Sequence, residues 1–247
     1  LSPIERRCPP VSGPVGDVAM PAVTAWPVPY SERSQPRLNM NRQRPSRELS
    51  GKIREKPKQH NTTVDGALAA AFALALYQST SWPERQVRVT TPIDARKYDD
   101  LDYGLSFQAL FPTYGYEATS HERFWEISRQ VTQDRHAFRA RPGMTALVDM
   151  LESVMNNHGL DKMIKFDREI CAPDILISNL GVLPFTQDFG KLTLESLWGP
   201  NVLIGTEGEQ TIGVATINNA IHLIHTSYQP AADFLANAEK ILYQATA

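Results

Sequence analysis

The stretch Asp174-Ile-Leu-Ile-Ser-Asn-Leu-Gly181 carries the most information about the fold of this chain. Its Ile-Leu-Ile run is short, apolar and rich in β-branched residues, and it stops at a polar Ser-Asn pair. A buried strand that brings functional groups to the edge of a cleft has this pattern. Thr91-Pro-Ile-Asp-Ala-Arg96 also stops at polar residues. We therefore predict two buried strands with functional residues at their ends.

The composition predicts a globular protein and excludes several function classes. The 247 residues, 42% of them hydrophobic, suffice for one large domain or two small ones. The net charge is −2 and the basic residues are scattered, so we expect no nucleic-acid partner. No apolar run approaches the roughly 18 to 20 residues that cross a bilayer, and no secretory signal begins the chain. We expect a soluble, cytoplasmic protein without a transmembrane segment.

The cysteine pattern predicts neither a disulfide framework nor a metal site. Cys8 and Cys171 lie far apart in the chain, with no Cys-x-x-Cys spacing and no His-rich neighbourhood. In a cytoplasmic protein both would be reduced thiols. We therefore expect no bound metal.

The composition changes once, near residue 48. Residues 1–48 hold nine of the eighteen prolines and almost no periodic apolar pattern, which predicts a proline-rich linker or arm. Residues 49–247 are regular, and we predict that they form the folded lobe. Its first clear element is a helix over Val64–Tyr77, preceded by Thr62-Thr63 and apolar on nearly every face. Such a helix should be buried on most sides.

Two paired strands and two helices should follow. Residues 86–93 and 105–111 have strand patterns separated by an acidic turn. Thr119 and Glu122 have the spacing of a capping box, for a helix with an inner apolar face. Residues 144–155 repeat the helical spacing. The expected inner residues are Phe124, Ile127 and Val131 on the first helix and Leu147, Leu151 and Val154 on the second.

The C-terminal part predicts a hairpin and a final helix. Residues 210–217 and 220–228 flank Asn218-Asn219, a dipeptide that tolerates positive φ in a two-residue turn. Pro230 should open a helix. The inner face of this helix would carry Phe234, Ala238, Ile241 and Leu242. The element order predicts an α/β fold with a mixed, mostly antiparallel sheet and flanking helices.

Four motifs in this order resemble the C-terminal half of the chloramphenicol-acetyltransferase-like superfamily, over about residues 45–245. This superfamily includes peptide-synthetase condensation domains, plant acyltransferases that use coenzyme A, and polyketide-associated transferases that esterify long-chain diols. The matching segments are Thr62–Ala73, Thr91–Arg96 with Gly104–Gln108, Asp174–Gly181, and Asp188–Gly190 with Leu197–Gly199. The chain departs from the family at Gln108, where Asn is commoner, and no aromatic residue follows Gly190.

The resemblance implies one lobe of a two-lobed acyltransferase. The family moves an acyl group from a coenzyme A or carrier-protein thioester to an alcohol or amine, in secondary-metabolite or lipid biosynthesis. Its signature, His-His-x-x-x-Asp-Gly, lies in the N-terminal half. We therefore expect the catalytic His in an N-terminal lobe, in the same or a second chain, and no cofactor beyond the thioester substrate. The alternative is a non-catalytic carrier-protein or lipid-binding module that retains the fold.

The segment His60-Asn-Thr-Thr-Val-Asp65-Gly66 is a near match to the signature, with Asn61 in place of the second His. An Asp in the first turn of a helix is stabilised by the helix dipole, so we favour helix-start chemistry over catalysis by His60. Ser178 is not in a Gly-x-Ser-x-Gly elbow, which gives a hydrolase triad no support. This chain by itself has no convincing catalytic base.

The remaining histidines offer no better base. His121 and His136 lie on a charged helix, and His158 lies in a turn. His222 and His225 are three residues apart on one hairpin strand and so should point to opposite faces. None has a suitably spaced carboxylate or nucleophile beside it.

The resemblance also assigns roles to site residues. Arg96 matches an Arg that pairs with the signature Asp and supports the active site, or it caps a strand end beside Asp99. Ser178 and Asn179 would line the thioester channel and hydrogen-bond the pantetheine or the oxyanion, or they form a turn before Gly181. The structural residues are Asp188, Gly190 and Gly181.

Overall fold

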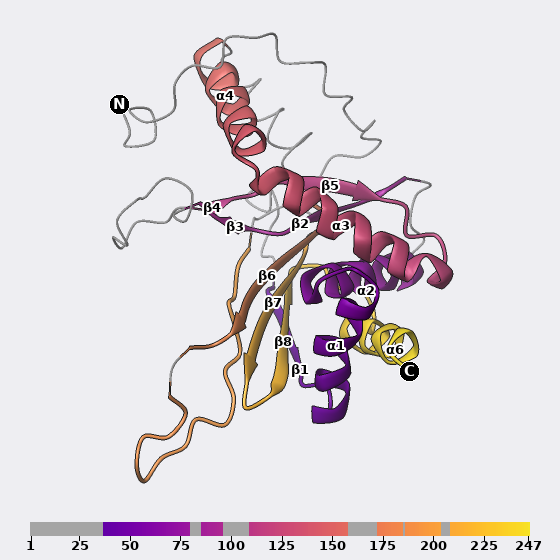
Figure 1. Ribbon diagram of the computed structural model, residues 1–247, viewed down its shortest axis with the longest axis vertical. Coiled ribbons are helices and arrows are strands. Elements are labelled where there is room, and N and C mark those ends of the chain that lie inside the picture. The colour runs from indigo at the N-terminus through magenta and orange to yellow at the C-terminus, as the bar shows by residue number, and fades with distance from the viewer. Residues whose placement is uncertain (1–36, 80–84, 96–108, 158–171, 185, 204–207) are drawn as a thin grey trace.

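The computed structural model describes residues 37–79, 85–95, 109–157, 172–184, 186–203 and 208–247, and its main feature is a six-stranded mixed sheet (Figure 1). In spatial order the strands are β1 (Asn39–Gln43), β8 (Ala220–Ser227), β7 (Gln210–Ile217), β6 (Ile175–Val182), β2 (Val87–Thr90) and β5 (Thr113–Tyr116). β6 runs parallel to both β2 and β7, and the other pairs are antiparallel. The predicted α/β class with a mostly antiparallel sheet is confirmed.

Helices cover one face of this sheet, with α1, α2 and α6 lying side by side on it in Figure 1. The helices are α1 (Arg47–Gln59), α2 (Val64–Ser79), α3 (Phe124–Arg139), α4 (Arg141–Asn157) and α6 (Phe234–Ala245). A second, two-stranded sheet pairs β3 (Ile93–Asp94) with β4 (Ala109–Leu110). Leu110 and Leu147 of α4 pack against a small cluster of Ile93 and Phe138.

The alanine-rich helix α2 lies at the centre of the core, as its all-round apolar pattern predicts. Every residue from Gly66 to Leu76 is buried. The Phe72 ring lies 5.3 Å from the Phe234 ring of α6. At Gly66 a Cβ would overlap the backbone oxygen of Ser128, so only glycine permits this approach between α2 and α3. Small side chains therefore let three helices pack around one that is fully enclosed.

The two faces of the sheet follow from the alternation along each strand. Apolar side chains packed against the helices define the helix face, and they are Val87, Val89, Ile175, Ile177, Ile212, Val214, Ile221 and Leu223. Side chains between them must point to the opposite face, and these include Arg88, Thr90, Ser178, Thr211 and His222. The sheet thus has an apolar face and a more polar one.

Residues 186–203 cover part of the opposite face on their return from a loop that projects from the sheet (Figure 1, orange, lower left). The Trp198 ring meets the His222 ring edge-on at 5.0 Å. Asn201 Oδ1 accepts a hydrogen bond from Thr226 Oγ1 at 3.2 Å. At Gly213 a Cβ would overlap the backbone of Gly199 and Pro200. Glycine at this position therefore lets the returning segment lie directly on the sheet.

The hairpin and the inner faces of α3 and α6 follow their predictions closely. β7 and β8 are joined by Asn218 and Asn219, whose φ angles are 52° and 60°, as a two-residue turn requires. The predicted inner residues of α3 and α6 are buried. Leu151 and Val154 of α4 were also predicted to point inward, but their side chains lie outside the described part of the structure.

Several expected boundaries were wrong. Residues 86–93 do not form one strand paired with residues 105–111, because Pro92 lacks a backbone N–H and the ladder stops at Thr90. β2 pairs instead with β5, which we did not predict, and only the short β3 pairs with β4. Residues 105–108 lie outside the described ranges.

The predicted helix starts also shift. Ser120, rather than Thr119, accepts the capping hydrogen bond, from the Glu122 N–H at 3.3 Å, and a 3-10 turn (His121–Arg123) precedes α3. The final helix begins at Phe234 after the left-handed Asp233, and not at Pro230. In both places a short backbone turn separates the residue that predicted the helix start from the first residue of the helix.

The end of the predicted arm belongs to the folded unit. β1 pairs with β8 over Asn39–Gln43, and α1 begins at Arg47 with Ser46 as its N-cap, neither of which we predicted. Polar residues dominate β1, so its strand state comes from pairing with β8 rather than from its own pattern. Residues 1–36 lie outside the described ranges, and their assignment as an arm stays a prediction.

Candidate functional site

Ser178 and Asn179 lie within β6, just before its bulge, and their side chains take opposite directions. Ser178 is opposite Gly213 in the β6–β7 register, on the face that residues 199 and 200 cross. Asn179 points to the helix face, where its Nδ2 donates to Asp65 Oδ1 at 2.8 Å. Consecutive strand residues alternate between faces, so one flat channel wall cannot receive both. Their contacts with a thioester stay predictions.

The Asn179 side chain also fixes the bend at the end of β6. Its Oδ1 accepts the Gly181 backbone N–H at 2.8 Å. Gly181 has a φ of 67°, and the register with β7 shifts between Asn179 and Val182. A bulge with a left-handed glycine re-aims the residues around it. Glycine at position 181 therefore permits the bend of β6.

Asp65, in the first turn of α2, connects this bend to helix α3. Its Oδ2 lies 2.9 Å from Arg135 Nη1, and its other oxygen accepts from Asn179. Burial lowers the pKa of the Arg135 guanidinium, while the charge of Asp65 acts in the opposite direction. We call Arg135, Asp65, Asn179 and Gly181 the Asp65 network. Sequence analysis assigned Asp65 only to helix-start chemistry and missed its contact with Asn179.

A stripe of polar residues on α3 holds the start of α2 in place. Ser128, Thr132 and Arg135 are spaced four and three apart, so they share one face of the helix. Thr62 Oγ1 donates to the Ser128 carbonyl at 2.7 Å and lies 2.8 Å from Thr132 Oγ1. Thr63 Oγ1 accepts the Gly66 N–H at 3.1 Å and so caps α2. These contacts determine where Asp65 lies.

His60 has a contact that explains its position without catalysis. It follows the last turn of α1, and its ring stacks on Trp125 at 3.8 Å with an angle of 9° between planes. The Asp of its near-match motif, Asp65, belongs to the Asp65 network. Catalysis by His60, which the sequence analysis did not favour, has no supporting contact among the described residues.

The remaining predicted residues divide between described and undescribed parts of the chain. Arg96 lies outside the described ranges, so its support of an active site stays a prediction. Asp188 and Gly190 form a tight turn. Asp188 Oδ1 accepts the Gly190 N–H at 2.9 Å, and Asp188 pairs with Thr193. Gly190 has a φ of 81°, which favours glycine.

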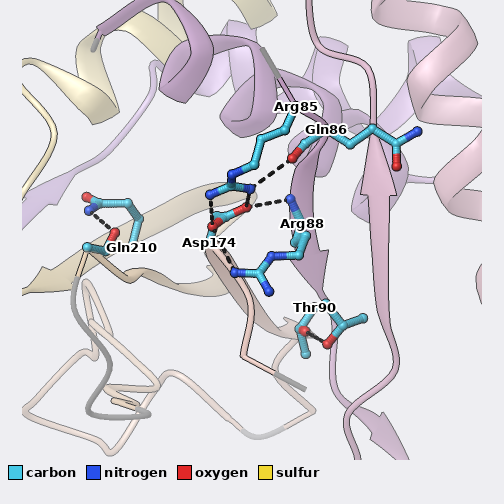
Figure 2. Close-up of polar contacts among 8 residues, drawn as sticks. Arg85, Gln86, Arg88, Thr90, Asp174 and Gln210 are labelled. Atoms are coloured by element: carbon cyan, nitrogen blue, oxygen red, sulfur yellow. Dashed lines mark hydrogen bonds and ion pairs between the residues drawn. The ribbon is translucent and has the colours of Figure 1, made fainter. Parts of the chain in front are cut away.

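A buried cluster that we did not predict lies at the other end of β6, where Figure 2 shows Asp174 between Arg85 and Arg88. Arg85 forms a bidentate pair with Asp174, with N–O distances of 2.7 and 2.8 Å. The Arg88 backbone N–H donates to Asp174 Oδ2 at 2.8 Å, and Arg88 Nη2 lies 3.3 Å from Oδ1. Both Arg88 and Asp174 are more than nine-tenths buried. An arginine between two valines in a strand was the available sequence signal.

Buried polar atoms without partners in the described part of the chain occur on the opposite face. They are Nε and Nη1 of Arg88, Oγ1 of Thr211 and both ring nitrogens of His222. Burial lowers the pKa of His222. The hydroxyls of Thr90 and Thr113, also on this face, lie 2.5 Å apart. Ser178 therefore shares a face with groups that have unused hydrogen-bonding capacity.

A polar pocket of about 360 Å³ lies at the β5 edge of the sheet and contains none of the predicted site residues. Its lining is Gln86, Gly115, Tyr116, Glu117, Arg123, Gln130 and Asp134. The Tyr116 hydroxyl donates to Asp134 Oδ2 at 2.9 Å, and burial raises the pKa of both groups. Internal hydrogen bonds and ion pairs already use much of this polar surface.

The described ranges contain neither a metal-binding cluster nor a membrane-spanning helix. Within them, no group of three His, Cys, Asp or Glu side chains is arranged to hold a metal ion. No helix in the same ranges has the length and apolar character needed to span a membrane.

Solved structures with the same arrangement of elements come from several acyl-transfer systems. A trichothecene 15-O-acetyltransferase from Fusarium sporotrichioides matches with a TM-score of 0.57 and 13% identity, over 85% of this chain and 46% of that one. A wax ester synthase/diacylglycerol acyltransferase from Marinobacter aquaeolei VT8 matches at 0.54 and 11%, over 84% and 48%. The condensation domain for chain release from the enacyloxin polyketide synthase matches at 0.54 and 15%, over 90% and 44%.

This chain spans about half the length of each of these structures. No protein-family model and no curated protein sequence matches it. At such low identities the likeness establishes the fold, and the reaction has to be argued from the site.

Proposed function

We propose, from the premise that the chain has the fold of one lobe of the chloramphenicol-acetyltransferase-like superfamily, that it is the C-terminal lobe of an acyltransferase. The fold likeness carries this proposal, because it extends over most of the chain to an O-acetyltransferase, a wax ester synthase and a condensation domain. The donor would be a coenzyme A or carrier-protein thioester, and the acceptor an alcohol or an amine.

The proposed reaction needs a general base that an N-terminal lobe would supply. The acceptor oxygen or nitrogen attacks the thioester carbonyl carbon while an imidazole takes its proton. The C–S bond then breaks as the imidazolium returns this proton to the leaving sulfur, which departs as the free thiol. A base of pKa near 6.5 suits this step, and such proton transfer contributes about a hundred- to ten-thousand-fold. None of the described histidines of this chain has a contact that prepares it for the role, since His60 stacks on Trp125, His222 is buried and His225 bonds Gln210.

This lobe would contribute the wall of the thioester channel. Ser178 supports this role best, because it lies in β6 just before the bulge, with no hydrogen-bond partner for its hydroxyl in the described ranges. A hydroxyl fixed beside a developing oxyanion can be worth about 3 kcal/mol. Arg96 would support the active site from the segment that follows β3. Carrier-protein binding is proposed because condensation domains share this fold.

The alternative is a non-catalytic module that binds a carrier protein or a lipid on the same face. The observation that favours it is the lack of a poised base among the described histidines. An upstream lobe with an intact His-His-x-x-x-Asp-Gly would count against it.

The test is acyl transfer by this chain joined to its native N-terminal half. The joined protein is given labelled acyl-coenzyme A or acyl carrier protein, and ester or amide products with a panel of alcohols and amines are measured. Ser178→Ala should reduce the transfer rate by about tenfold or more. Ser120→Ala, at a distant helix cap, is the matched control and should leave the rate unchanged. If the joined protein transfers no acyl group to any acceptor, the enzyme proposal fails.

A further inference from the structure

We propose that Asp65 is a positioning residue: together with Arg135 it sets the orientation of the Asn179 amide, and through it the bend of β6 that places Ser178. The inference deepens the proposed function and rests on it for its catalytic consequence. Its geometric part depends only on the contacts of this chain.

The first step is that carboxylate chemistry determines how the Asn179 amide is turned. An ionised carboxylate can only accept hydrogen bonds, so the Asn179 NH₂ group must face Asp65. The Nδ2–Oδ1 distance of 2.8 Å fits this orientation. The amide oxygen is then left on the other side, where it accepts the Gly181 N–H at 2.8 Å. A neutral amide at position 65 could satisfy Asn179 in either orientation.

The second step is that Asp65 itself is held firmly. Arg135, whose side chain is 11% exposed, lies 2.9 Å from the second carboxylate oxygen of Asp65, which is 26% exposed. Hydrogen bonds between charged partners are about twice as strong as neutral ones. The close approach of Gly66 to Ser128 fixes the helix that carries Asp65. The Asn179 amide is therefore oriented by a rigid part of the core.

The third step is that the bend depends on this amide. The last regular β6–β7 partners before the bulge are Asn179 and Val214, and pairing resumes at Val182. Leu180 is 49% exposed and Val182 63% exposed, so apolar packing does not hold the bend. The Asn179–Gly181 hydrogen bond is the contact across the bulge within β6. Ser178 lies one residue before Asn179, opposite Gly213 in the regular register, so the strand that carries it continues directly into the bend.

The experiment first measures amide hydrogen exchange at Gly181 by NMR in this chain. Asp65→Asn removes the charge with little change of shape, and we expect Gly181 to exchange at least fivefold faster. Ser50→Ala is the matched control, because it removes a buried hydroxyl that accepts the Ile221 N–H without touching Asp65 or Asn179. It should leave the Gly181 rate unchanged. If Asp65→Asn does not fold, Asn179→Ala, at a partly buried position, tests the same hydrogen bond.

The second measurement uses the joined lobes. Asp65→Asn and Asn179→Ala should each lower kcat about tenfold with little change in KM for the acceptor. The double variant should be no slower than either single variant, because both changes break one chain of contacts. A merely structural role would lower the melting temperature, as we expect for Ser50→Ala, without this shared loss of kcat.

The outcomes separate the two proposals. Unchanged Gly181 exchange in Asp65→Asn overturns the positioning role, even if the joined lobes are active. Fully additive losses of kcat overturn it as well. Joined wild-type lobes that transfer no acyl group overturn the proposed function, and with it the catalytic consequence of the network.

Discussion

A histidine on the helix face of the sheet and a histidine on the opposite face differ in their hydrogen bonding. His225 and His222 lie three apart on β8 and point to different faces. On the helix face, His225 Nε2 lies 2.8 Å from Gln210 Oε1 and its ring packs on Phe234. On the opposite face, both nitrogens of His222 lack a partner among the described residues, and its ring meets Trp198. Among the described residues, the histidine of the helix face therefore has a hydrogen-bond partner and the histidine of the opposite face has none.

The difference indicates where stability and function lie. A buried polar group without a hydrogen bond costs about 1 to 3 kcal/mol, so folded proteins retain few of them. Local choices that disagree with stability occur most often at functional sites. On the opposite face, Arg88, Thr211 and His222 have buried polar atoms without a hydrogen bond among the described residues, and Ser178 lies on the same face. Four experiments would test this comparison.

The largest effect is expected on the helix face. Phe72→Ala removes a fully buried ring that packs against Phe234. We expect the free energy of unfolding to fall by about 4 kcal/mol, from lost burial and the cavity that remains. Urea denaturation would measure it. Leu192→Ala, at a side chain that is 74% exposed, is the control and should cost less than about 0.5 kcal/mol. Equal losses would contradict the assignment of the core.

The second effect is a pH dependence on the helix face. Burial lowers the pKa of His225 from 6.5 to about 4. As pH falls below 6.5 the unfolded chain takes up a proton that the folded chain refuses, so stability is full above pH 6.5 and falls by about 3 kcal/mol by pH 4. His225→Gln should flatten unfolding free energy against pH in this window. His136→Gln, at an exposed position of α3, is the control, and an equal flattening there would contradict the prediction.

The third effect tests the cover of the opposite face. Gly213→Ala places a methyl group against the backbone of residues 199 and 200. We expect a loss of about 2 kcal/mol, in the range for an overpacked contact, and increased protease cleavage within residues 186–203. Gly51→Ala, where a Cβ would meet nothing within 4 Å, is the control and should not destabilise the protein. Tolerance of Gly213→Ala would mean that this segment does not lie on the sheet.

The smallest effect is expected at the unpartnered histidine. His222→Leu removes buried ring nitrogens that have no hydrogen bond to lose, so unfolding free energy at pH 7 should stay within about 1 kcal/mol or rise. His225→Leu, its counterpart on the helix face, loses the contact with Gln210 and should cost more than His222→Leu does. The reverse order would show that the opposite face is satisfied within this lobe.

Local sequence signals predicted much of the fold. The alanine-rich pattern identified α2, and Asn218-Asn219 identified the β7–β8 turn, because each depends on neighbouring residues alone. The strand that carries Ser178 and Asn179 was also found, although it continues to Val182 and does not stop at this pair. β1 and β5 were missed, since their polar or short patterns become strands only beside β8 and β2.

The sequence predicted where the candidate site lies in the chain but not the contacts among its residues. Sequence analysis located Ser178, Asn179 and Gly181 but gave Ser178 and Asn179 one shared direction, and it left Asp65 at the start of a helix. Asp65 and Asn179 are 114 residues apart, and no local pattern records their contact. The Asp174 cluster was missed for the same reason, because its two arginines precede Asp174 by more than eighty residues.

The sequence by itself determined the class of fold, the central helix and the hairpin, because periodicity and turn chemistry are properties of a few adjacent residues. Only the tertiary structure decided which polar groups have partners and which face of the sheet stays incomplete. Hydrogen bonds such as Asp65–Asn179 and ion pairs such as Asp174–Arg85 join distant segments. Their existence depends on how strands register and helices pack, which no single segment specifies.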